Sequence, residues 1–167
     1  MGLRVCILED QYGFILHQMV MQRQTDDRVA VPMVYEAKKR FPDLRSCSFD
    51  KGFYTPKNRE KLQGILDKVI LPKKGKLSAK DKEIEYSEDF IELRRRHSGV
   101  ESAINALENH SLDRCPDHGL VGFKRYVALA VLARNIQILG NIIQQRELKR
   151  QKRREKLRRN PRYRMAA

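Results

Sequence analysis

The chain has 167 residues, enough for one domain with a sizeable core. Its formal net charge is +14, from 35 basic and 21 acidic residues, which favours a polyanionic partner because Lys and Arg neutralise phosphates and release counterions. Three scattered cysteines offer no disulfide framework, and the first apolar run is too short for a signal peptide, so we expect a cytoplasmic protein.

The sequence opens with two β-prone runs, residues 3–9 and 14–21, on either side of a short segment that contains Gly13. This pattern predicts a β-hairpin. Thr25 then offers an N-cap, with acidic residues in the first turn, for a helix that runs to about Arg40. Pro32 lies within its first two turns, so we expect the helix to start late or to bend.

Short strands and a helix are predicted next. Residues 47–49 form a short strand that places Asp50 at its carboxyl end. Thr55 and Pro56 are a typical helix start, with a cap residue followed by proline at the first helical position. Residues 69–71 are a buried strand, and the charged stretch 73–86 is predicted to be an exposed irregular loop.

Two long helices complete the pattern, at about 89–108 and 121–145. Polar residues interrupt the apolar run 126–143, which favours a buried amphipathic helix over a membrane span. Strands that alternate with helices after a hairpin indicate an α/β domain with a mixed sheet. We assign this domain to residues 1–145 and a basic tail to residues 146–167, which hold 11 Lys and Arg against two Glu. The tail is either a helical extension or a disordered arm with non-specific affinity for nucleic acid.

Two carboxylates are the best candidates for chemistry. Asp50 lies at a strand end, and Glu101 lies on a predicted helix amid basic residues. Mg²⁺ prefers oxygen ligands and is usually held by one or two carboxylates together with substrate phosphate. Such a pair suits metal-dependent phosphoryl transfer, although a turn Asp or a helical Glu is by itself commonplace.

Three segments, in the same order, resemble the C-terminal part of DDE transposases of bacterial insertion sequences, which share the RNase H-like fold with retroviral integrases. They are Ser48-Phe49-Asp50-Lys51-Gly52-Phe53-Tyr54, Val69-Ile70-Leu71-Pro72-Lys73-Lys74-Gly75 and Arg94-Arg95-Arg96-His97-Ser98-Gly99-Val100-Glu101-Ser102-Ala103-Ile104. The resemblance covers about residues 3–145. It departs from the family pattern around the third carboxylate, where Arg94, His97 and Glu108 stand in place of Tyr, Arg and Lys.

The resemblance implies an RNase H-like mixed sheet flanked by helices, and it assigns Asp50 and Glu101 as catalytic ligands of Mg²⁺ or Mn²⁺. It implies cleavage and strand transfer at the ends of an insertion sequence, with DNA as partner, no membrane, and a homodimer in the DNA complex. Lys51, Lys73, Arg94 and His97 are the candidate phosphate contacts, each of which can equally be a solvated basic residue or, for His97, a half-buried helix residue.

The family's first carboxylate, carried by its first strand, has no clear counterpart. If residues 3–9 and 14–21 are the second and third strands, the first strand lies upstream, and the copy is truncated and inactive alone. Asp10, at the hairpin turn, is the one acidic residue placed to substitute. Two other functions stay open: a non-catalytic basic nucleic-acid-binding protein, and an RNase H-like nuclease that acts on other substrates.

Overall fold

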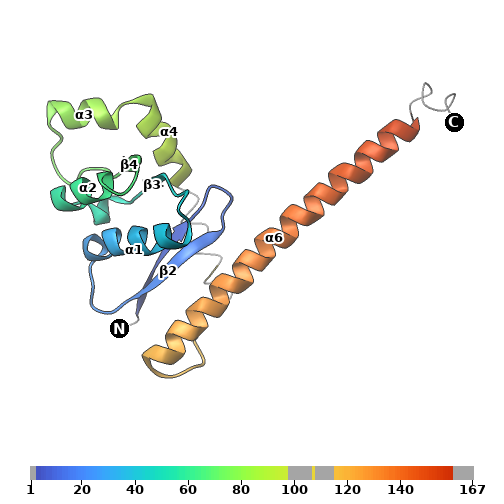
Figure 1. Ribbon diagram of the computed structural model, residues 1–167, viewed down its shortest axis with the longest axis horizontal. Helices are drawn as coiled ribbons and strands as arrows, with labels where there is room; N and C mark the ends of the chain where they lie inside the picture. Colours follow the sequence, from blue (N-terminus) through green and yellow to red (C-terminus); the bar gives the residue numbers. More distant parts are fainter. Residues whose placement is uncertain (1–2, 98–106, 108–114, 160–167) are drawn as a thin grey trace.

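The computed structural model describes residues 3–97, 107 and 115–159, and these form an α/β domain from which one long helix projects (Figure 1). The elements, in chain order, are β1 (Arg4–Glu9), β2 (Ile15–Met21), α1 (Asp26–Arg40), β3 (Ser46–Ser48), the 3-10 turn η1 (Lys51–Phe53), α2 (Pro56–Gln63), β4 (Lys68–Ile70), α3 (Ala79–Glu85), α4 (Glu88–His97) and α6 (Gly119–Arg159). The predicted α/β class and the order of its first strands and helices are confirmed.

The described strands form two small sheets instead of the single mixed sheet expected from the sequence. β1 and β2 make the predicted antiparallel hairpin, with a register shift between Leu8 and Glu9, and Gly13 takes a φ of +87° in the turn. β3 and β4 pair in parallel, with Ser46 opposite Lys68. No pairing joins β1 to β3 among the described residues, so each of these strands has one edge without a strand neighbour.

Helix α1 covers the hairpin (Figure 1) and contributes four of the nine buried residues that form the larger core within the described part of the chain. Val29, Met33 and Ala37 recur at four-residue spacing and are almost fully buried. This spacing keeps them on one face of the helix. Pro32 is exposed inside the helix, which nevertheless begins at Asp26, so the predicted late start is wrong. The tertiary contacts of the buried face outweigh the local cost of the proline.

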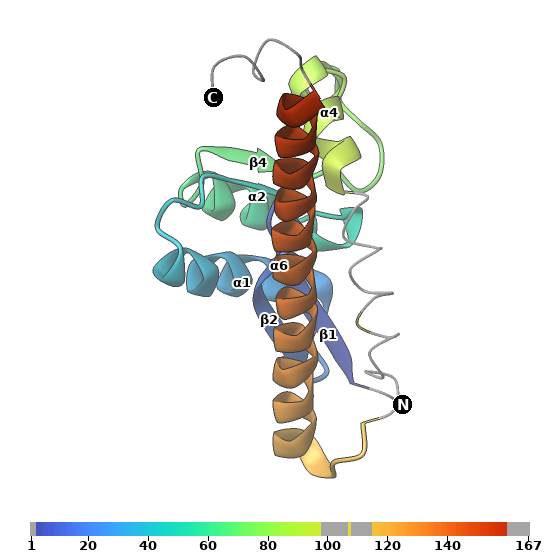
Figure 2. The ribbon, with the colours of Figure 1, turned by 90° about the vertical axis from the view of Figure 1, so that its right-hand side faces the viewer.

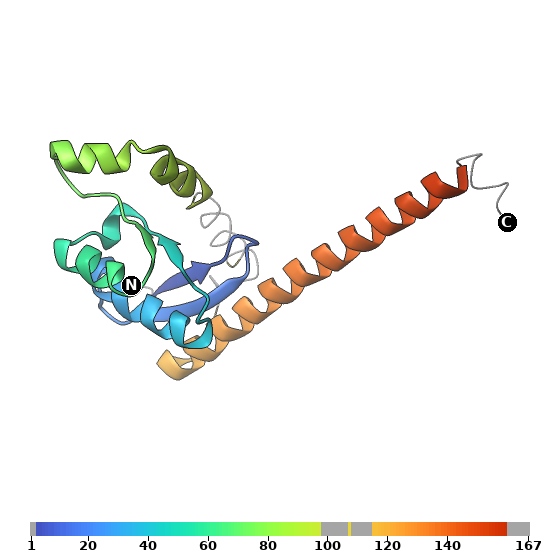
Figure 3. The ribbon, with the colours of Figure 1, turned by 45° about the horizontal axis from the view of Figure 1, so that its top comes forward.

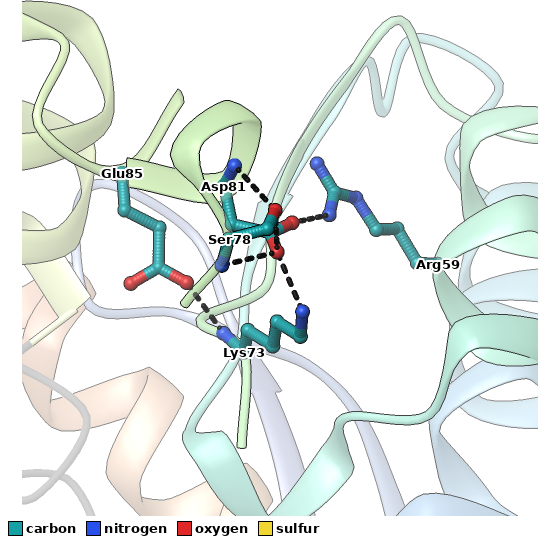
Figure 4. A network of polar contacts seen from close by, with 5 residues as sticks. All are labelled: Arg59, Lys73, Ser78, Asp81 and Glu85. Carbon is teal, nitrogen blue, oxygen red and sulfur yellow. Dashed lines mark hydrogen bonds and ion pairs between the residues drawn. The ribbon is translucent and has the colours of Figure 1, made fainter. Parts of the chain in front are cut away.

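The segment predicted as an irregular loop, residues 73–86, contains a helix, α3, so that prediction is wrong. A capping box starts the helix: Ser78 Oγ accepts a hydrogen bond from the Asp81 N–H, and the Asp81 carboxylate accepts one from the Ser78 N–H. The Asp81 carboxylate also binds Arg59 at 3.2 Å and the Lys73 ammonium at 2.5 Å (Figure 4). These contacts tie α3 to α2 and to the segment that follows β4.

Helix α4 begins at Glu88, close to the predicted start. Most of the predicted continuation to residue 108 lies outside the described residues. Leu107 is described, and it is buried in a second, smaller cluster with Ile15, Ala130 and Val131. This cluster attaches α6 to the hairpin.

Helix α6 is 41 residues long and therefore spans about 60 Å. Its first half packs against β2, whereas its second half leaves the body of the domain (Figures 1 and 3). In Figure 2 the projecting half comes toward the viewer, and α6 is seen in front of the domain. The predicted helix ends at residue 145, but the structure continues it to Arg159, so the described part of the basic tail is a helical extension. By length and composition alone α6 could cross a membrane, and 22% of its apolar window is buried in the protein.

Candidate functional site

A pocket of about 580 Å³ separates the two sheets. All of β1 lines one side, and all of β3 together with Phe49 and Asp50 lines the other. The strand edges that face it belong to β1 and β3, which pair only with β2 and β4 respectively among the described residues. Unpaired strand edges offer backbone N–H and C=O groups, so this pocket is lined by hydrogen-bonding backbone as well as by apolar side chains.

The two strands that line the pocket run in opposite directions. Arg4, at the start of β1, forms an ion pair with Asp26 at 3.3 Å. Asp26 also lies against Gly52, just after β3, where an added Cβ would come within 3.0 Å of its Oδ2. The start of β1 and the end of β3 therefore lie at the same end of the pocket, and glycine at position 52 allows this close approach.

Asp50 stands at that end of the pocket, just after the end of β3, and its predicted position at the carboxyl end of a strand is confirmed. Its Oδ1 accepts a hydrogen bond of 2.7 Å from the Lys51 N–H, and its backbone carbonyl accepts one from the Phe53 N–H. The side chain is exposed, and its Oδ2 makes no hydrogen bond or ion pair within the part of the chain that the structure describes. Asp50 thus presents an ordered carboxylate with one oxygen open to a hard cation.

Asn58 was not singled out in the sequence, but it holds the loop that carries Asp50. Its amide nitrogen donates to the carbonyl of Asp27 at 2.6 Å and to that of Phe53 at 3.0 Å. The same residue donates its backbone N–H to the Thr55 side chain, which caps α2. One side chain therefore connects the start of α1, the turn after Asp50 and the start of α2. No sequence signal shows this role, because its partners lie on separate elements.

Asp10, the alternative first carboxylate, has a structural role in the hairpin turn. Its Oδ1 accepts hydrogen bonds from the N–H groups of Tyr12 and Phe14, at 2.8 and 2.9 Å. It follows the carboxyl end of β1, whereas Asp50 lies near the start of β1. Six strand residues span roughly 20 Å, which is far too long for the two carboxylates to share metal ions about 4 Å apart.

The pocket also contains two thiols, Cys6 on β1 and Cys47 on β3. Burial raises the pKa of Cys6 to about 11, with a further contribution from Asp26. Burial likewise raises the pKa of Cys47 to about 12. Both thiols are therefore protonated at neutral pH, and thiolate chemistry at this pocket is disfavoured.

The predicted phosphate contacts lie in different surroundings. Lys51 is exposed beside Asp50, and Arg94 is exposed on α4. Lys73 is bound twice: its ammonium pairs with Asp81, and its backbone N–H donates to Glu85 at 2.6 Å (Figure 4). The hydrogen bond from Lys73 is the main reason that the pKa of Asp81 falls well below its usual range.

Of the two remaining candidate site residues, His97 and Glu101, the structure describes only the backbone of His97. His97 ends α4, and nothing is described of its side chain. Glu101 lies outside the described residues, so the structure places Asp50 but does not place its predicted partner. Among the described residues, no cluster of three His, Cys, Asp or Glu side chains could hold a metal ion.

Comparison with known proteins assigns the family. No curated protein and no solved structure matches the chain. A family model described as a transposase DDE domain matches residues 1–136, which is most of the chain and includes both strand pairs, Asp50 and the first part of α6. The chain therefore belongs to the transposase DDE domain family.

Proposed function

We propose that this chain is part of a DNA transposase and contributes two of the carboxylates that hold divalent metal ions, Asp50 and Glu101. The observation that carries the proposal is the position of Asp50. It follows the short strand β3 and the buried Phe49, its loop is fixed by Asn58, and one oxygen is left open at the end of a pocket. The family match supports the reaction class, cleavage and strand transfer at the ends of a mobile element.

Each residue has a separate task in this proposal. Asp50 and Glu101 hold Mg²⁺ or Mn²⁺, and such ions stabilise the attacking and leaving oxygens of phosphoryl transfer. Lys51 and Arg94, both exposed, contact backbone phosphates, and His97 does so from the end of α4. Lys73 joins them only if its ammonium leaves Asp81, because that ion pair now satisfies it.

We also propose that the complete catalytic domain has one more strand, which carries the first carboxylate and lies between β1 and β3. Three features support this position: the pocket separates the sheets, a strand edge faces it from each side, and the two edges run in opposite directions. A strand that entered antiparallel to β1 would be parallel to β3 and would join both sheets, with its backbone paired on either side. In this proposal that strand supplies the third carboxylate of the metal site.

Metal binding by Asp50 can be tested on the chain as it is. We expect Mn²⁺ to broaden the backbone NMR signals of Lys51 and Gly52 selectively, because a paramagnetic ion relaxes nearby nuclei most strongly. Asp50→Asn should abolish the broadening, whereas Asp43→Asn, at an exposed loop position, should leave it unchanged. Equal broadening in wild type and Asp50→Asn would refute the assignment of Asp50 as a ligand.

Activity is tested in a family member that is known to cleave DNA. In an intact family member, the equivalent of Asp50→Asn should abolish Mg²⁺-dependent cleavage of DNA that contains the element ends. Retained cleavage would overturn the catalytic role. Cleavage of RNA–DNA hybrids in preference to element ends would instead favour the alternative of an RNase H-like nuclease.

The second candidate function is non-catalytic binding of nucleic acid. It is favoured by the basic end of α6, where residues 146–159 hold nine Lys and Arg against two Glu on an exposed helix. DNA affinity that falls steeply with salt and does not depend on Mg²⁺ would support this function for the isolated chain. DNA remains the proposed partner in both cases, together with a cytoplasmic, nucleoid-associated location and a homodimer in the DNA complex.

A further inference from the structure

An apolar stripe on α6 has no partner within the part of the chain that the structure describes. It consists of large side chains that are each at least half exposed, and we call it the α6 seam: Leu129 (62%), Leu132 (54%), Ile136 (60%), Leu139 (50%) and Ile143 (58%). Single exposed apolar residues are ordinary, but a contiguous row on one face indicates an interaction site.

The seam has the spacing of a coiled coil. Its members follow one another at intervals of three, four, three and four residues, so they occupy alternating d and a positions of a heptad. The face that packs on the domain body is different and includes Val127, Ala130 and Val131. The seam is therefore separate from the contacts that hold α6 on β2.

We propose that the α6 seam pairs with the same seam of a second copy of this chain, as a parallel two-helix coiled coil. Leu129, Ile136 and Ile143 take the a positions, and Leu132 and Leu139 take the d positions. Ile at a with Leu at d favours two parallel strands over larger assemblies. A seam is self-complementary, since each knob enters a hole formed by the same residues of the partner helix.

The charge beyond the seam separates the two helices again. After Ile143 the next a and d positions are Arg146, Arg150 and Arg153, on a segment with nine basic and two acidic residues from 146 to 159. Facing arginines repel, so the helices pair along residues 129–143 and diverge after Arg146. The result is a fork with two basic arms. A DNA duplex between the arms neutralises them, so DNA binding and pairing strengthen each other.

A second copy fits the seam better than a lipid bilayer does. Residues 129–143 extend only about 22 Å along the helix, short of the hydrocarbon core of about 30 Å. Arg134, Asn135 and Asn141 lie on other faces of the same turns, and the side chain of Asn135 is bound to β2. A helix in this position cannot leave the domain for a membrane without breaking those contacts.

The pairing is tested by sedimentation velocity over a concentration series, with and without a 20-base-pair duplex. Because the seam covers just over two heptads, we expect a dimer that dissociates in the micromolar range and that duplex DNA strengthens at least tenfold. Leu139→Glu should raise the dissociation constant at least thirtyfold. Asn141→Glu adds the same charge two residues away, off the seam, and should leave it within about threefold of wild type.

Orientation is tested by cysteine cross-linking under mild oxidation, against the wild-type chain for background from its natural cysteines. In the parallel pair, Leu139→Cys should cross-link to itself, and Asn141→Cys should not. In an antiparallel pair, Leu132→Cys should instead cross-link to Leu139→Cys when the two variants are mixed, and Leu139→Cys alone should not cross-link. That result would overturn the proposal. A monomer at every concentration, or binding to phospholipid vesicles that Leu139→Glu abolishes, would also overturn it. Neither result would bear on the metal role of Asp50, which the Mn²⁺ experiment tests separately.

Discussion

Asn135 is the residue whose replacement tests most directly how α6 is held on the hairpin. Its Oδ1 accepts a hydrogen bond from the Ile15 N–H at 2.9 Å, and its Nδ2 donates one to the Ile15 carbonyl at 3.0 Å. One amide thus pairs with both backbone groups of the first residue of β2, in the way that a neighbouring strand would. Both bonds are partly buried and join residues 120 positions apart.

Asn135→Ala should lower the free energy of unfolding by about 2 kcal/mol. A typical hydrogen bond contributes about 0.5–1.5 kcal/mol net, and two are lost here, while the Ile15 groups are left partly shielded from water. Asn135→Asp should cost at least as much, because a carboxylate keeps the acceptor but opposes the Ile15 carbonyl with negative charge. For a chain of this length, about 2 kcal/mol corresponds to a fall in Tm of roughly 4–8 °C.

The measurement is urea and thermal unfolding of the wild type, both Asn135 variants and Asn141→Ala, an exposed position on the same helix. Asn141→Ala should lie within about 0.5 kcal/mol of wild type, as expected for a surface change. The reasoning fails if Asn135→Ala is no more destabilising than Asn141→Ala. It also fails if Asn135→Asp is clearly milder than Asn135→Ala, since the donated hydrogen bond would then contribute nothing.

Three further predictions concern other parts of the domain. His17 is buried without a hydrogen-bond partner for either ring nitrogen among the described residues, and burial, followed by Arg40, lowers its pKa. The stabilisation from neutral His17 is therefore complete above about pH 6.5 and is lost as the pH falls from there through the lowered pKa. Between pH 7.5 and 5.5, the wild type should lose more free energy of unfolding in urea than His17→Leu does. Parallel pH dependences of the two proteins would contradict this. Ser78→Ala removes the N-cap of α3 and should lower the free energy of unfolding by about 1 kcal/mol. Amide hydrogen exchange should become faster in α3 and not in α1. Unchanged exchange in α3 would show that the cap is dispensable. Asn58→Ala should leave the domain folded but weaken Mn²⁺ broadening at Lys51, because the loop after Asp50 loses its anchor; full broadening at the same Mn²⁺ concentration would contradict the positioning role.

The sequence could predict the parts of this fold that depend on local signals. The hairpin follows from two β-prone runs around Gly13, and α2 begins where the Thr55 cap and Pro56 indicate. Asp50 was placed at a strand end because an apolar run stops there, and the structure agrees. Helix α3 was missed although its capping residues, Ser78 and Asp81, are visible in the sequence, because its charged composition resembles that of a loop. The salt bridges that stabilise it come from Arg59 and Lys73, on other segments.

Tertiary structure alone decided how these elements meet. The sequence by itself determined which segments are strands and helices, that the charge suits DNA, and which carboxylate stands at the end of β3. It did not determine that the sheets stand apart around a pocket, that Arg4, Asp26 and Gly52 meet at one end of it, or that α6 keeps an unpartnered seam. The physical reason is that helix caps, turns and periodic burial arise from neighbours in sequence. Strand pairing and side-chain docking join residues that are tens of positions apart, and no local pattern records which of them will meet.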